Sequence, residues 1–158
     1  MSKASANLSA KIRDFMEVPP KVIPEDATID DAAGTMWDLN IGSVMVVDKE
    51  GHMAGIITER DILFAVTKSL VGNDVPVTSI MSKTSLMGSP NEGLVTAVDR
   101  MIKGGVRHLP VIDKDGTPLG MVSMRDAMGI TEPLLKFVFK MTRKKSAAKK
   151  SSAPRTKA

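Results

Sequence analysis

Two short motifs in this sequence place a hydroxyl, a guanidinium and a carboxylate at one fixed spacing. In each, a Ser or Thr is followed two residues later by Arg and three residues later by Asp: Thr58, Arg60 and Asp61 in the first, and Ser123, Arg125 and Asp126 in the second. The carboxylate can accept charge-assisted hydrogen bonds from both hydroxyls of a ribose, and the guanidinium can hold a phosphate through two N–H groups. The motifs therefore supply the parts of a site for a phosphorylated sugar.

The same residues also have a purely structural interpretation. A hydroxyl followed three residues later by an acid forms a helix capping box, which usually does no more than satisfy free backbone N–H groups. For one motif alone this interpretation is favoured. Two copies in register, each with an Arg directly before the Asp, favour ligand binding instead.

Both motifs belong to a longer internal repeat at an offset of 65 residues. Residues 46–61 align without gaps on residues 111–126, and seven of these 16 pairs are identical. At the same offset Met16 falls on Met81, Ile29 on Leu94, Ala32 on Ala97 and Met36 on Met101. Duplication of a unit of about 60 residues explains these matches.

Each unit predicts a short extended piece, a helix, two strands around a tight turn, and a second helix. The expected strands are 43–47 and 53–57 in the first unit and 108–112 and 118–122 in the second, with turns at 48–51 and 113–116. The second helix starts at Thr58 or Ser123, so each motif lies where a strand passes into a helix. Since neither copy has enough apolar surface to be stable alone, we expect units 9–70 and 76–129 to pack face to face about a pseudo-twofold axis.

This order resembles a tandem pair of CBS (cystathionine β-synthase) domains, also called a Bateman module. The resemblance rests on residues 55–61 and 120–126 at the strand-to-helix junctions and on residues 105–111, Gly-Val-Arg-His-Leu-Pro-Val. It implies an α/β (α+β) fold of two β-α-β-β-α repeats that binds AMP, ADP, ATP or a related adenosine compound in clefts between the repeats. It implies a regulatory module that signals occupancy to a partner and requires no cofactor.

Further site candidates flank the motifs. Arg107 and His108 can contact phosphate, whereas Gly42 and Ser43 occupy the equivalent positions of the first unit, so the two clefts should not bind equally. Strand side chains that can hold the faces of a purine are Met45 and Pro110.

The composition excludes several classes of protein. There is no Cys and there are only two His, which removes disulfides and thiolate zinc sites and leaves little for a histidine metal centre. No Walker loop, Gly-x-Gly-x-x-Gly or Gly-x-Ser-x-Gly motif is present, so we expect no enzyme activity. No stretch approaches the roughly 18 apolar residues of a membrane span, and we expect a cytoplasmic protein without a transmembrane segment.

Charge is divided sharply along the chain. Residues 1–135 carry a net charge of −5, while residues 136–158 carry +9 and no acid. We expect a helix over 131–145 and a disordered basic tail over 146–158. The tail leaves a second function open, in which residues 144–158 bind nucleic acid or an anionic surface and the body only dimerises.

We also expect a homodimer. Two helical faces would otherwise stay partly exposed on so small a body: Ile29, Ala32 and Met36 in the first unit, and Leu94, Ala97 and Met101 in the second.

Overall fold

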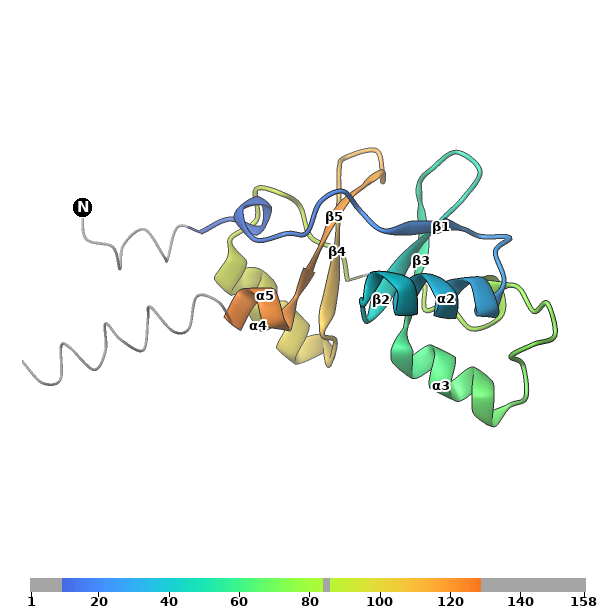
Figure 1. Cartoon of the computed structure of the whole chain (residues 1–158). Coiled ribbons are helices and arrows are strands. Elements are labelled where there is room, and N and C mark those ends of the chain that lie inside the picture. The colour runs from blue at the N-terminus through green and yellow to red at the C-terminus, as the bar shows by residue number, and fades with distance from the viewer. Residues whose placement is uncertain (1–9, 84–85, 129–158) are drawn as a thin grey trace, which may run out of the picture.

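The computed structural model describes residues 10–83 and 86–128, which contain two similar α/β units (Figure 1). The first unit holds β1 (Val22–Pro24), α2 (Ile29–Leu39), β2 (Ser43–Val47), β3 (Met53–Thr58) and α3 (Glu59–Thr67). The second holds α4 (Leu94–Gly104), β4 (His108–Ile112), β5 (Pro118–Ser123) and α5 (Met124–Met128). This arrangement confirms the predicted α/β pair of repeats. The helix expected over 131–145 and the tail after it lie outside the described residues.

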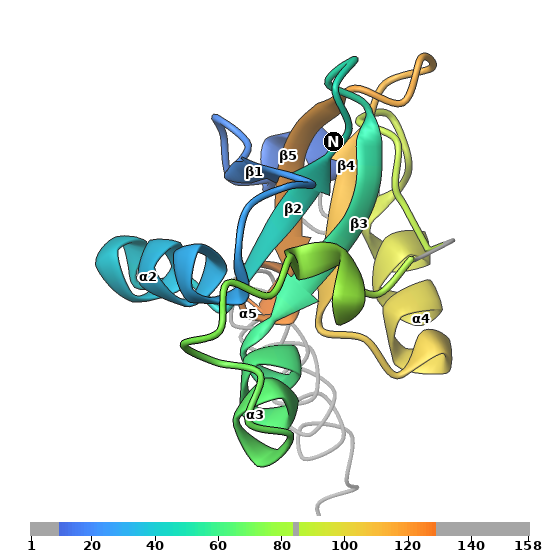
Figure 2. The same ribbon diagram turned by 90° about the vertical axis from the view of Figure 1, so that its right-hand side faces the viewer.

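The two hairpins are alike to the residue. β2 pairs with antiparallel β3 and β4 with antiparallel β5 in registers that differ by 65, and each ladder shifts at the equivalent place, between Val46 and Val47 and between Val111 and Ile112. The strands end within one residue of the predicted bounds. Figure 2 shows both turns at the same end of the molecule, where the N–H of Met53 donates to the carbonyl of Gly116 at 2.9 Å. The duplication seen in the sequence is therefore also a duplication in structure.

An aspartate and a glycine close each turn. Asp48 Oδ1 accepts two backbone N–H groups at 3.1 and 2.8 Å, and Asp113 Oδ1 accepts the equivalent two at 2.9 Å each. The turns end on Gly51 and Gly116, with φ of +85° and +89°. Because side chains rarely tolerate that left-handed backbone, glycine fits both positions.

The segment before the first unit packs on the second one. The 3-10 helix η1 (Ile12–Asp14) places Ile12 fully buried in the core of the second unit. The next residues run beside β5, where the N–H of Glu17 donates to the carbonyl of Met121 at 2.8 Å. We call residues 10–17 the first lead-in. They precede the first unit in the sequence but belong structurally to the second.

The segment before the second unit packs in turn on the first. The 3-10 helix η2 (Val77–Ser79) buries Val77 in the first unit's core, and Ser82 and Ile56 of β3 exchange two backbone hydrogen bonds at 2.9 and 3.0 Å. Residues 75–82 are the second lead-in. The exchange of lead-ins ties the two units together through strand pairing as well as through side-chain packing.

The apolar faces of α2 and α4 are buried within the chain. Their residues are at most 5% exposed: Ile29, Ala32, Met36, Leu94, Ala97 and Met101. The reason given above for a homodimer is therefore wrong, because β-strands of the same unit and the exchanged lead-in already cover these faces. The large apolar side chains that do remain exposed on the helices lie elsewhere: Trp37, Leu39, Leu63, Phe64, Val66, Val95 and Ile102.

None of the helices in the described ranges is long and apolar enough to span a membrane.

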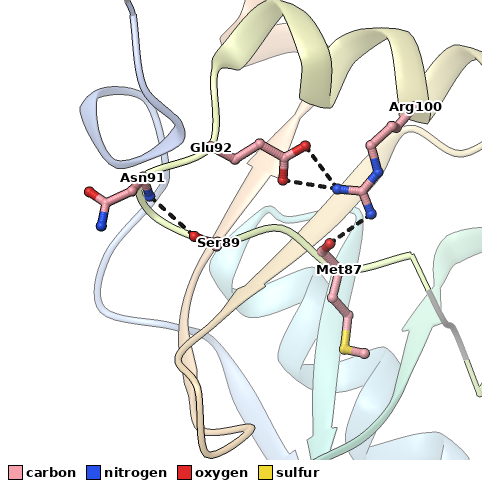
Figure 3. A network of polar contacts seen from close by, with 5 residues as sticks. All are labelled: Met87, Ser89, Asn91, Glu92 and Arg100. Carbon is pink, nitrogen blue, oxygen red and sulfur yellow. Dashed lines mark hydrogen bonds and ion pairs between the residues drawn. The ribbon is translucent and has the colours of Figure 1, made fainter.

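One polar network fixes the entry into α4 (Figure 3). Arg100 Nη1 donates to both carboxylate oxygens of Glu92 at 2.8 and 2.9 Å, and Arg100 Nη2 donates to the carbonyl of Met87 at 2.9 Å. The side chain of Arg100 is only 34% exposed and that of Glu92 only 18%. The guanidinium therefore holds residues 87–92 against the helix.

We expect Arg100→Ala to lower the free energy of unfolding by about 2 kcal/mol, because it leaves a partly buried carboxylate and a carbonyl without their charged donor. Urea denaturation measures this change. Lys103→Ala is the matched control on the same helix, since the Lys103–Asp99 pair is 75% and 56% exposed and exposed pairs contribute at most about 0.5 kcal/mol. Equal losses in the two variants would contradict this account of the network.

Candidate functional site

A cleft of about 970 Å³ lies between the two units. The second motif forms one wall through Ser123, Arg125 and Asp126, and Gly42 and Ser43 of the first unit face it. The other residues that line this large cleft are Glu17, Pro19, Lys21, Ala33, Gly34, Met36, Trp37, Asn40, Ile41, Glu59, Ile62, Arg107, His108, Met121 and Met124. Its volume falls in the range of about 300–1,000 Å³ that is usual for small-molecule sites.

A smaller cleft of about 280 Å³ holds the first motif. Here Thr58, Arg60 and Asp61 face Arg107 and His108 of the second unit. The remaining lining residues are Gly42, Ile56, Glu59, Ser82, Gly105, Val106 and Pro110.

The two clefts are equivalent under the 65-residue offset. Ser123 and Asp126 of the large cleft correspond to Thr58 and Asp61 of the small one, and Glu17 corresponds to Ser82. The position facing the motif differs, because Gly42 and Ser43 stand in the large cleft where Arg107 and His108 stand in the small one. Four residues line both clefts and so form the wall between them: Gly42, Glu59, Arg107 and His108.

Of the candidates identified from the sequence, the structure brings all but one to these clefts. Met45 lines neither cleft and is fully buried. It lies in β2, the middle strand of the order β1-β2-β3, where it pairs with Val22 on one side and Ile56 on the other. Pro110, its equivalent, does line the small cleft.

Both Asp side chains of the motifs make capping bonds. Asp126 Oδ2 accepts the N–H of Ser123 at 2.9 Å and its hydroxyl at 2.6 Å, and Asp61 Oδ2 accepts the same groups of Thr58 at 2.8 and 2.7 Å. Within the described residues no hydrogen bond reaches Oδ1 of either aspartate. One oxygen of each carboxylate thus holds the helix start, and the other can accept a ligand's hydroxyl.

His108 and Glu59 converge on Gly42. A Cβ built on Gly42 would lie 3.3 Å from Glu59 Oε2 and 3.5 Å from His108 Cε1, so the absence of a side chain there gives room to both. Burial lowers the pKa of His108 below its ordinary value of 6.5, and the positive charges of Arg107 and Arg125 lower it further. The carboxylates of Glu59 and Asp126 act in the opposite direction without outweighing the burial.

This lowered pKa predicts a pH dependence of stability. Because His108 binds a proton more weakly in the folded chain than in the unfolded chain, its neutral form contributes fully above the unfolded pKa of about 6.5. That contribution is lost as the pH falls from there through the folded-state pKa. Urea denaturation at stepped pH should show His108→Gln losing less stability across this window than the unaltered chain. His52→Gln keeps His108 and should still lose more stability across this window than His108→Gln does, and identical profiles for the two variants would contradict the assignment.

Three residues of the large cleft that bear on binding are absent from the candidates predicted from the sequence. Lys21 reaches the cleft from the residues before β1, Trp37 from α2 and Glu59 from the start of α3. Trp37 is 85% exposed although it follows the apolar spacing of its helix. Glu59 could have been found, since it lies inside the first motif at the position of Met124.

Among the residues that the structure describes, no three His, Cys, Asp or Glu side chains gather as they would around a metal ion.

Comparison with known proteins places the whole of this arrangement in one family. Residues 12–68 and 77–131 each match the CBS domain. A 17.7 kDa protein of Acidianus ambivalens is 34% identical over 119 residues, which are 75% of this chain and 71% of that protein.

Solved structures agree with the family match. The CBS domain of a CBS domain-containing membrane protein from Sphaerobacter thermophilus has a TM-score of 0.68 and 29% identity, and the match covers 80% of this chain and 91% of that one. A CBS domain protein from Pyrobaculum aerophilum complexed with AMP has a TM-score of 0.70 and 26% identity, with 74% and 89% covered. The chain therefore belongs to the CBS domain family and carries two CBS repeats in tandem.

Proposed function

We propose that this chain is a regulatory module that binds an adenosine-type ligand in the clefts between its repeats. The observation that carries the proposal is the large cleft, in which Ser123 and Asp126 of one repeat face Gly42 and Ser43 of the other. The AMP complex of the Pyrobaculum aerophilum relative supports the choice of ligand class.

In the large cleft each part of such a ligand meets suitable chemistry. Oδ1 of Asp126, which accepts no hydrogen bond from the described residues, can accept a ribose hydroxyl, and Lys21, Arg107 and Arg125 supply positive charge for a phosphate. Apolar side chains in the lining can enclose the purine: Met36, Ile41, Ile62 and Met121. The ligand would bind without reacting, so the proposed role is regulation and not catalysis.

Regulation follows from where the walls come from. Since each repeat contributes one side of each cleft, a bound ligand bridges the two and stabilises their mutual arrangement. We propose that the partner protein reads this arrangement, so that occupancy changes its contact with the module.

Titration of the full chain with AMP tests the proposal. Trp37 is the chain's single Trp and lines the large cleft, so its emission reports on that cleft directly. We expect AMP to change the emission of Trp37 and to raise the melting temperature. Mass analysis of the supernatant of heat-denatured protein would show any nucleotide that co-purifies. If millimolar AMP and adenosine both leave emission and melting temperature unchanged, the proposal is wrong.

We also propose a homodimer, now on different residues. The apolar side chains that the fold leaves exposed on helices include Leu63 at 65%, Ile102 at 63% and Val95 at 58%, and association would remove them from water. If light scattering gives the mass of a monomer at a chain concentration of tens of micromolar, the homodimer proposal is wrong.

The basic tail supports a second candidate function, in which residues 136–158 bind nucleic acid through their charge of +9. Lysines and arginines on such a segment contact phosphates and carry no base code, so binding would be independent of sequence. With about five cations engaged on duplex DNA, log K against log salt should have a slope of roughly −4 to −5. Deleting residues 144–158 should remove most of that dependence. A full chain that retards no nucleic acid at low salt would exclude this candidate.

A further inference from the structure

Among the described residues, the wall between the two clefts carries the only cation that both clefts share, Arg107, beside His108 as a further hydrogen-bond donor. Arg107 and His108 line the large cleft and the small cleft alike, and Glu59 lies beside them in the same wall. The other basic side chains of the described lining each belong to one cleft only: Lys21 and Arg125 line the large cleft, and Arg60 lines the small one.

The first repeat offers no second pair. Its equivalents of Arg107 and His108 are Gly42 and Ser43, which carry no charge, and Ser43 is only 6% exposed. The twofold relation of the clefts is therefore broken at the place where a phosphate would be held. Two ligand sites of similar design depend on one guanidinium and one neighbouring imidazole N–H.

The charge of this wall decides what a second anion would meet. In this wall Glu59 Oε2 and His108 Cε1 lie close together, at 3.3 and 3.5 Å from a Cβ built on Gly42, and Arg107 lines the same two clefts. A phosphate that engages Arg107 and His108 from one cleft leaves the wall with excess negative charge. A second phosphate in the other cleft would face that charge and the Glu59 carboxylate from the opposite side of the same four residues.

We propose that Arg107 and His108 form one anion clamp that serves both clefts, so that the chain holds one phosphorylated ligand at a time. The inference rests on the proposed function and extends it from ligand class to occupancy. A ligand without phosphate makes no demand on the clamp, so it fills both clefts. The number of bound ligands then depends on their charge: one for a phosphorylated ligand and two for a ligand without phosphate.

Equilibrium dialysis of the full chain against AMP and against adenosine tests the clamp without any substitution. We expect one AMP and two adenosine molecules per chain at saturation. Two AMP molecules bound independently would overturn the shared clamp. A count of one AMP in the first experiment and one adenosine in the second would also overturn it, because a single cleft able to bind ligand would explain both counts. No binding of either ligand would overturn both the clamp and the proposed function.

Two variants separate exclusion from a cleft that is merely inactive. Asp126→Ala should weaken AMP binding in the large cleft and Asp61→Ala in the small one. At AMP concentrations that saturate only the unaltered cleft, each variant should still bind one AMP there. If the wild-type protein and both variants each bind one AMP, both clefts are able to bind AMP and each excludes it from the other. A variant that binds none while its partner variant binds one would contradict the inference. Binding of one adenosine by each variant shows that the other cleft is still folded.

Discussion

Replacing Asp126 with alanine is expected to weaken AMP binding in the large cleft about 10- to 100-fold. The carboxylate has one oxygen on Ser123 and one without a hydrogen bond from the described residues, and a charged hydrogen bond left unmade costs about 1.5–3 kcal/mol. Titration followed by the emission of Trp37 measures the effect in this cleft. Asp126→Glu should retain the cap, because Glu is the usual acid of a capping box, but should move the oxygen away from the ribose.

The control for this prediction comes from the first helix of the same chain. Thr28 and Asp31 form the same kind of box, with Asp31 Oδ2 accepting the N–H of Thr28 at 2.9 Å and its hydroxyl at 2.8 Å. Asp31 lines neither cleft, so Asp31→Ala removes a cap without touching the ligand. Unchanged affinity in both Asp126 variants would leave capping as the sole role of the motif. Equal weakening by Asp31→Ala would mean that the loss is only one of stability.

Gly120→Ala is expected to lower the free energy of unfolding by about 3 kcal/mol. A Cβ on Gly120 would lie 2.7 Å from the carbonyl oxygen of Glu17 and 3.1 Å from Met16 Sδ. The first contact is with backbone, so the first lead-in must move away from β5 and give up its pairing with Met121. Urea denaturation measures the change in the free energy of unfolding.

Gly34→Ala is the matched control for the added methyl. Gly34 lies in α2, where nothing comes within 4 Å of a Cβ, and Ala in a helix is more favourable than Gly by roughly 0.5–1 kcal/mol. That variant should be more stable than the unaltered chain. If Gly120→Ala unfolds at the same urea concentration as the unaltered chain, the close approach of the first lead-in to β5 is not as described.

The hairpins could be predicted almost to the residue, whereas the exchange of lead-ins could not. Strands and turns leave local signals, namely short apolar runs and an Asp and a Gly at fixed places in each turn. The sequence also shows the identical pairs Met16/Met81 and Gly55/Gly120, but it does not show which Met packs on which Gly. Met16 packs on Gly120 and Met81 on Gly55, each across to the other unit, and a duplicated sequence is equally consistent with packing inside its own unit.

The candidate site divides in the same way. Residues placed by the strand-to-helix junctions were predicted because a junction is local, and they line the clefts as expected. Met45 was misplaced because its burial depends on β1, which adds a parallel strand on the far side of β2. Lys21 and Trp37 come from other elements that meet the motif only through tertiary packing. Two non-local facts, sheet order and lead-in exchange, thus account for what the sequence could not predict.

A crystal structure of the full chain grown with saturating AMP would show whether the ligand binds between the repeats. We expect one nucleotide per chain in a cleft between the repeats, with a ribose hydroxyl within hydrogen-bond distance of Asp126 or Asp61 and the phosphate at Arg107 and His108. Clefts that stay empty at saturating AMP, or nucleotide bound only elsewhere on the surface, would contradict this expectation.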